Sequence, residues 1–261
     1  MVLNILSIAG SDPSGGAGVQ ADLKTFAALG VYGMAAITAL TVQNTRGVRA
    51  VHPVDAEVVA AQVEAVLDDV RVDAVKIGML GDAAVIAAVA GVLRVRRPPV
   101  VVLDPVLVAT SGDALLAGGA VPTLLAELLP LADLVTPNVP EAAALLGGEV
   151  ARDESEQTGQ ARALAELGPA VLLKGGHLGG DESVDVLVDG GRTTRLTVRR
   201  VATTSTHGTG CTLSSALAAL RLSSPDWVTT ARAAKAYVSR ALVAGAQLDV
   251  GHGHGPLRHD V

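Results

Sequence analysis

The chain has 261 residues, of which 49% are apolar but only 2% aromatic, and its net charge is −6. This size suits one α/β domain with a core of Val, Leu, Ile and Ala, while the acidic balance excludes a large nucleic-acid footprint. One cysteine excludes an internal disulfide framework, and no signal-peptide pattern or membrane-length apolar run occurs. We therefore expect a soluble protein of the cytoplasm that spans no membrane.

Apolar runs bounded by turn residues alternate with segments of helical periodicity along the chain. We predict strands at residues 2–9, 34–40, 74–77, 100–103, 134–136 and 170–174, and helices at 19–29, 56–70, 83–93, 121–129, 155–167, 216–222 and 226–246. Another helix is expected to begin at Pro140, and Asp55 and Asp82 are expected to cap theirs.

The remaining segments are predicted from turn residues and alternation. Residues 43–54 suggest a small β element, and residues 184–189 and 195–201 form a predicted hairpin around Gly190-Gly191. Residues 110–113 are read as a loop, and residues 250–261 as an irregular tail. The alternation predicts a single α/β domain over residues 1–261, with a central, mostly parallel sheet covered on both faces.

Polar residues recur where apolar segments end. Asp12, Asp104, Asn138 and Lys174 each follow a predicted strand, and Cys211 follows the hairpin. In open α/β sheets the ligand crevice lies at the carboxyl ends of the strands. The sequence therefore predicts a site at this edge of the sheet.

A glycine-rich turn, THGTGCT at residues 206–212, runs directly into a helix. Gly208 and Gly210 allow a close approach of the backbone to a ligand, and the free N–H groups of a helix start favour an anion such as phosphate. A thiol at a helix N-terminus is expected to have a lowered pKa. Cys211 would then take a hydroxyl proton as a base, or simply hold the substrate.

Three further sets of residues allow two interpretations each. Lys174 can reach phosphate oxygens or remain solvated. Asn138 and Glu141, with Asp104 nearby, can hold a water-coordinated Mg²⁺ beside phosphates, or Asn138 caps a helix whose dipole Glu141 complements. Gln43 offers a donor and an acceptor that match an aminopyrimidine edge, or it satisfies nearby backbone.

Eight segments together resemble the hydroxymethylpyrimidine/phosphomethylpyrimidine kinase family. In chain order they are AGSDPSGGAGVQADLKT (9–25), LTVQNT (40–45), KIGML (76–80), DPVLVATSG (104–112), TPNVPE (136–141), LKGGH (173–177), THGTGCT (206–212) and GHGHGP (251–256). The resemblance implies a three-layer α/β/α fold of the ribokinase-like type, a homodimer, and phosphorylation of a pyrimidine hydroxymethyl group and then of its monophosphate. ATP and Mg²⁺ are the implied cofactors, and thiamine biosynthesis the implied pathway.

The resemblance also implies roles for residues at matching positions. Gln43 would read the pyrimidine, surrounded by Gly10, Asp22, Met79 and Val106. Cys211 would be the base, and Gly208, Thr209 and Gly210 would form the anion hole. Lys174, Asp104, Asn138 and Glu141 would serve ATP and the metal, Glu141 largely through water and phosphates. The alternatives are a pyridoxine or pyridoxal kinase of the same superfamily and a non-catalytic pyrimidine-binding protein.

Overall fold

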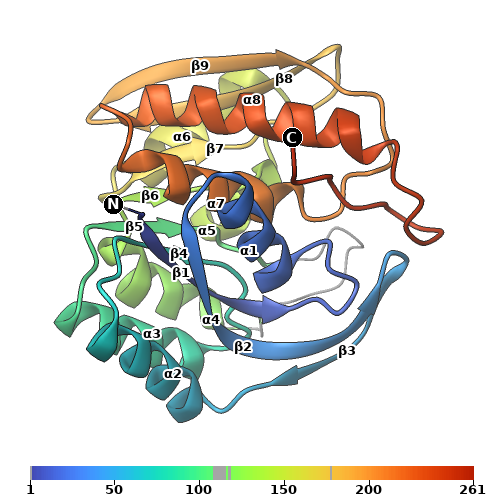
Figure 1. Cartoon of the computed structure of the whole chain (residues 1–261). Coiled ribbons are helices and arrows are strands. Elements are labelled where there is room, and N and C mark those ends of the chain that lie inside the picture. Colours follow the sequence, from blue (N-terminus) through green and yellow to red (C-terminus); the bar gives the residue numbers. More distant parts are fainter. Residues whose placement is uncertain (1, 108–115, 117–118, 177) are drawn as a thin grey trace.

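A nine-stranded sheet forms the centre of the computed structural model, which describes residues 2–107, 116, 119–176 and 178–261 (Figure 1). Its order is β3-β2-β1-β4-β5-β6-β7-β8-β9. The strands are β1 (Asn4–Ser11), β2 (Tyr32–Asn44), β3 (Gly47–Pro53), β4 (Ala74–Ile77), β5 (Val100–Leu103), β6 (Leu134–Val135), β7 (Ala170–Leu173), β8 (Glu182–Asp189) and β9 (Arg192–Arg199). The six strands from β2 to β7 in this order are parallel, and β3, β8 and β9 pair antiparallel at the two ends.

Helices cover both faces of the sheet. The helices α1 (Gly18–Ala28), α7 (Thr209–Arg221) and α8 (Trp227–Gly245) pack on one face. The opposite face carries α2 (Ala56–Asp69), α3 (Ala83–Val95), α4 (Ala120–Thr123), α5 (Val139–Leu146) and α6 (Glu154–Ala165), and the turns at 124–131 extend α4. The predicted three-layer fold with a mostly parallel sheet is confirmed.

Central strands account for the continuous apolar runs in the sequence. Every residue of β4, β5 and β7 is buried, because helices lie on both sides of these strands. One of these buried residues is Lys76, a charged side chain in the middle of β4.

Most predicted boundaries agree with the structure to within a few residues, although the helix predicted at 216–222 begins at Thr209. Both predicted caps occupy N-cap positions, but only one of them makes the cap hydrogen bond. Asp82 accepts a hydrogen bond from the Val85 N–H, as expected of an N-cap. Asp55 occupies the N-cap position of α2, but its exposed side chain makes no cap hydrogen bond. The predicted hairpin is formed by β8 and β9, and the predicted loop at 110–113 lies outside the described residues.

The C-terminal tail is irregular, as expected, but it is tied to the glycine-rich turn. The His207 N–H donates to Gly255 O at 3.0 Å, and the Tyr237 hydroxyl donates to His259 O at 2.8 Å. Leu257 is buried beneath α8. The tail therefore helps to hold the start of α7 in place.

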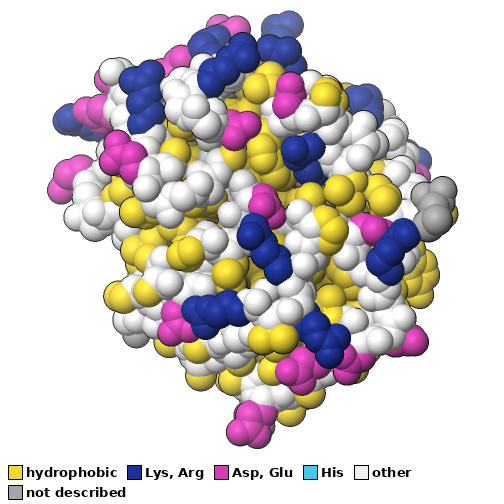
Figure 2. Space-filling view, turned by 90° about the vertical axis from the view of Figure 1, so that its left-hand side faces the viewer, with side chains coloured by type: hydrophobic (Ala, Val, Ile, Leu, Met, Phe, Trp, Pro, Cys, Tyr) yellow, Lys and Arg dark blue, Asp and Glu magenta, His cyan; other side chains and the backbone are white. Residues whose placement is uncertain are grey.

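Two general properties of the sequence can be compared with the structure. Within the described ranges, no helix is long and apolar enough to cross a membrane. On the face shown in Figure 2, Lys and Arg side chains are interspersed with Asp and Glu, without a broad area of one sign. That face lacks the basic surface that nucleic-acid binding needs.

Candidate active site

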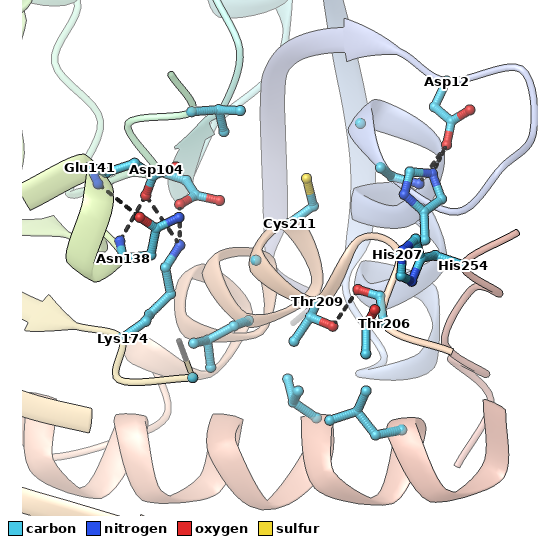
Figure 3. A pocket seen from close by; sticks show the side chains of 18 of the residues that line it. Asp12, Asp104, Asn138, Glu141, Lys174, Thr206, His207, Thr209, Cys211 and His254 are labelled. Atoms are coloured by element: carbon cyan, nitrogen blue, oxygen red, sulfur yellow. Dashed lines mark hydrogen bonds and ion pairs between the residues drawn. The ribbon is translucent and has the colours of Figure 1, made fainter. Parts of the chain in front are cut away.

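A cavity of about 780 Å³ extends along the carboxyl edge of the parallel strands, from the loop after β1 to α8. Figure 3 shows Cys211 lying between an acidic and basic cluster around Lys174 and a second pair formed by Asp12 and His207. Among the predicted site residues, those that line the cavity are Gly10, Gln43, Met79, Asp104, Val106, Asn138, Glu141, Lys174, Thr209, Gly210 and Cys211. The sheet edge predicted from the sequence is therefore the edge where these residues gather.

The glycine-rich turn forms one wall of the cavity. Gly208 precedes α7 with φ +83°, and an added Cβ there would lie 1.8 Å from Gly16 O, so the turn packs directly on the N-terminal loop. Gly208 itself does not line the cavity. Within the described chain, no backbone acceptor takes the N–H of Gly210 or Cys211. These two donors are the free helix-start groups that suit an anion.

Gly210 brings this helix start against the charged cluster. A Cβ at Gly210 would lie 3.4 Å from Lys174 Nζ and 3.5 Å from Asp104 Oδ2. A larger side chain would therefore fill the space in front of the ammonium group. An anion bound at the helix start would also meet Lys174.

Asp104 and Lys174 directly follow β5 and β7, and Glu141 lies in the first turn of α5, which follows β6 between them. Lys174 Nζ lies 2.8 Å from Asp104 Oδ1 and 3.9 Å from Glu141 Oε2. Burial alone would raise the pKa of Asp104, but the charges of Lys174 and Lys76 outweigh it and hold that pKa below its ordinary value. Burial tends to lower the pKa of Lys174, while Asp104 and Glu141 raise it. This pair is therefore charged, and the positive head faces the cavity.

Glu141 is electrostatically different from Asp104. Burial, reinforced by the charge of Asp104 and opposed by Lys174, raises its pKa to about 7. Glu141 also completes a capping box on α5, because Asn138 N–H donates to its carboxylate at 2.7 Å and Asn138 Oδ1 accepts from Glu141 N–H at 2.8 Å. The capping interpretation of Asn138 is confirmed.

The structure corrects the expected ionisation of Cys211. Burial raises the pKa of the thiol to about 11, and the charges of Asp22 and Asp104 add to this effect. The charge of Lys76 and the Gly18 N–H act in the opposite direction but do not outweigh it. The prediction of a lowered pKa is wrong, because the helix-start argument omits burial and the nearby carboxylates.

The other end of the cavity carries apolar and amide groups. Gly10 and Met79 are in contact, since a Cβ on Gly10 would lie 2.4 Å from Met79 Cε. Gln43 projects from the end of β2, with its Nε2 3.4 Å from His207 Nε2. The same imidazole nitrogen lies 2.7 Å from Asp12 Oδ2, and while it donates its N–H to that carboxylate it cannot also accept from the Gln43 amide N–H. The Gln43 amide therefore remains able to bind a ligand.

Asp22, like Gly208, is a predicted site residue that does not line the cavity. It is fully buried beneath the cavity, where its carboxylate binds Lys76, Ser7 and Ser215. The role of Asp22 around the pyrimidine, which the resemblance implies, stays a prediction. Its partner Lys76 lines the cavity instead.

Three interactions at the cavity were missed in the sequence analysis. They are the Asp12–His207 pair, the Lys76–Asp22 pair, and a buried ion pair between Lys235 and Asp185. Asp12 and His207 both lie in segments that carry the family resemblance, residues 9–25 and 206–212. Their place in these two segments is the one sequence signal that could have pointed to the pair. The described residues include no cluster of three His, Cys, Asp or Glu side chains suited to a metal.

Comparisons with known proteins find the same family along nearly the whole chain. A family model described as phosphomethylpyrimidine kinase matches residues 12–258. The chain is 52% identical to the hydroxymethylpyrimidine/phosphomethylpyrimidine kinase of Escherichia coli K12 over 258 residues, 98% of this chain and 97% of that protein.

Solved structures show the same similarity. The phosphomethylpyrimidine kinase of Clostridium difficile 630 is 39% identical with a TM-score of 0.80, covering 92% of this chain and 99% of that one. The pyridoxal kinase of Staphylococcus aureus in complex with pyridoxal is 33% identical with a TM-score of 0.91, covering 100% of this chain and 94% of that one.

Proposed function

The chain belongs to the phosphomethylpyrimidine kinase family, and from this premise we propose that it phosphorylates 4-amino-5-hydroxymethyl-2-methylpyrimidine twice in thiamine biosynthesis. It is an ATP-dependent kinase. In the first reaction the hydroxymethyl oxygen forms a bond to the γ-phosphorus while the bond from that phosphorus to ADP breaks. The second reaction transfers another phosphoryl group to the monophosphate and yields the pyrophosphate.

One observation carries the proposal: in the described part of the chain, a single cavity is lined both by the Gln43 amide, whose one recorded contact is at 3.4 Å to His207, and by the start of α7 with its unpaired N–H donors. The amide can pair with the aminopyrimidine edge, with Gly10, Met79 and Val106 around the ring. The hydroxymethyl group would then lie toward Cys211, between the ring and the phosphates. Phosphoryl transfer needs mainly positioning and stabilisation of charge, which this arrangement supplies.

The γ-phosphoryl group would lie against the N–H groups of Gly210 and Cys211, within reach of the Lys174 ammonium. Oriented donors of this kind stabilise transition-state charge by roughly 3–4 kcal/mol each. Cys211 would accept the hydroxyl proton or position the hydroxyl group. Since its pKa is about 11, the thiol form predominates at neutral pH, so a base role requires stabilisation of the thiolate.

Magnesium fits the donor set at this end of the cavity. Glu141 is a buried carboxyl whose pKa of about 7 leaves it close to ionisation, and Asp104 supplies another oxygen nearby. Mg²⁺ prefers one or two carboxylates together with water and substrate phosphates. We propose that Glu141, largely through water, and Asp104 hold an ion that neutralises phosphate charge. Asn138 would position Glu141 through the capping box.

The test is mass spectrometry of the products formed from Mg-ATP and the hydroxymethylpyrimidine. We expect the monophosphate first and the diphosphate later, with ADP formed in proportion. A second substrate, pyridoxal, is offered in parallel because the Staphylococcus aureus pyridoxal kinase has a TM-score of 0.91 to this chain. Phosphorylation of pyridoxal without any pyrimidine product would refute the proposal.

We further propose that residues 1–261 act as one domain in a cytoplasmic homodimer. Leu40 and Val42 lie two residues apart on β2, point to the same face, and are 53% and 45% exposed. A second copy of the chain could cover these apolar side chains. Light scattering should give twice the chain mass, and Leu40→Asp should shift the protein to the monomer. A wild-type monomer at micromolar concentration would contradict the dimer.

A further inference from the structure

Four fully buried polar side chains form a network directly beneath the start of α7. Asp22 accepts from Lys76 Nζ at 3.0 and 2.8 Å, from Ser7 Oγ at 2.6 Å and from Ser215 Oγ at 2.7 Å. The network joins β1, α1, β4 and α7. Asp22 is thus surrounded by donors, and the proposed reaction gives it no other role.

Lys76 connects this network to the cavity. An ammonium group has three N–H donors, and the Asp22 carboxylate takes two of them. Within the described residues, no other acceptor is recorded for Lys76 Nζ, and Lys76 lines the cavity. The next residue but one is Gly78, where an added Cβ would lie 2.8 Å from Nζ. The ammonium group therefore packs against Gly78, and a side chain at this position would displace it.

Cys211 lies above the same network. It precedes Ser215 by four residues on α7, so the two side chains share one face of the helix, and the Ser215 hydroxyl binds Asp22. Burial dominates the electrostatics of the thiol. Among the nearby charged groups, Lys76 most strongly favours the thiolate, while Asp22 on α1 and Asp104 after β5 disfavour it. Burial would lower the pKa of Lys76 itself, but Asp22 keeps it above its ordinary value. Lys76 therefore carries its charge at every relevant pH.

We propose that Lys76 is a positioning residue for phosphoryl transfer, held by Asp22 so that its ammonium group stabilises negative charge on the Cys211 sulfur. The inference extends the proposed function, because it assigns the support that a thiolate base at Cys211 needs. Cys211 releases its proton to solvent, the thiolate then takes the proton of the substrate hydroxyl, and the hydroxyl oxygen bonds to the γ-phosphorus as ADP leaves. Lys76 keeps its own proton throughout.

The chain's lone cysteine allows a direct test without substrate. Alkylation by iodoacetamide reports on Cys211 alone, since only the thiolate reacts. An opposite charge close to a titrating group moves its pKa by about 1–3 units. In Lys76→Met we expect the alkylation profile to move alkaline by about one pH unit or more, with a roughly tenfold lower rate at pH 8.

A second variant distinguishes the effect of losing the Lys76 cation from the effect of leaving the Asp22 carboxylate unpaired. The double variant Asp22→Asn/Lys76→Met has neither buried charge, so it avoids the folding penalty of a lone Asp22. We still expect an alkaline shift there, because Lys76 influences the thiol more than Asp22 does. A profile identical to that of the wild type in the double variant would overturn the proposal.

Kinetics supply the second readout. If Lys76 acts through Cys211, the double variant should lower kcat at least tenfold in the wild-type background and much less when Cys211→Ala is also present. An equal loss in both backgrounds would refute action through the thiol. The alkylation result does not depend on which substrate is phosphorylated, so failure of this inference can be told apart from failure of the proposed function.

Discussion

The pair formed by Asp12 and His207 joins the N-terminal loop to the glycine-rich turn across 195 positions of sequence. Asp12 also accepts from the backbone N–H groups of Ser14 and Ala17, both at 2.9 Å. Burial would raise the pKa of Asp12, but the hydrogen bonds from His207 and Ser14 outweigh it and lower the pKa to about 2. The charged form of Asp12 therefore stabilises the folded chain.

We predict that Asp12→Asn lowers the free energy of unfolding by about 2.5 kcal/mol at pH 7. A drop in pKa from the ordinary value of 3.8 to about 2 corresponds to that amount, at about 1.4 kcal/mol for each pH unit. Because the folded-state pKa is the lower one, the contribution is complete above about pH 4 and is lost as pH falls through about 2. At pH 3 roughly half of it should remain.

Urea unfolding of the wild type and Asp12→Asn at pH 7, 5 and 3 measures this difference directly. The matched control is Asp55→Asn, an exposed N-cap position without a side-chain cap bond, which should change stability by less than about 0.5 kcal/mol. A difference for Asp12→Asn that stays constant from pH 7 to 3, or one no larger than the control, would contradict the electrostatic argument.

Three further substitutions test the cavity. Cys211→Ala should lower kcat by about 10²-fold or more with little change in KM, and unchanged turnover in steady-state assays would remove the base role. Gly208→Ala should cost at least about 3 kcal/mol in urea unfolding, because φ is +83° and the Cβ would meet Gly16 O at 1.8 Å, whereas Gly148→Ala has open space and should be nearly neutral. Lys174→Met should cost about 3–5 kcal/mol by leaving Asp104 buried without its partner, and should raise KM for ATP; normal stability would show that Asp104 is not charged.

The sheet and its functional edge could be predicted because both follow from local patterns. Apolar runs of strand length ended in polar residues such as Asp104 and Lys174, and parallel strands bring such ends together. The capping box at Asn138 and Glu141 is equally local, since its two partners are three residues apart. These features need no knowledge of distant segments.

The missed features depend on partners far away in the sequence. Lys76 lies in an apolar strand, where a lysine is costly unless it is paired, and its partner Asp22 is 54 residues away. The prediction of a lowered pKa for Cys211 failed for a related reason. The helix start favours a thiolate, but the opposing burial and carboxylates exist only once the strands and α7 are packed together. Neither effect can be read from spacing alone.

The charges around the cavity also bear on what must enter with the nucleotide. Lys174 is neutralised by Asp104 and Lys76 by Asp22, so the two ion pairs leave little net positive charge. The start of α7 contributes about half a positive charge, which is small against the several negative charges of ATP phosphates. Glu141 adds a further carboxyl at the same end of the cavity. Arg199 and Arg200 also line the cavity and add positive charge. We propose that a divalent ion at Glu141 neutralises the remaining charge of the polyphosphate.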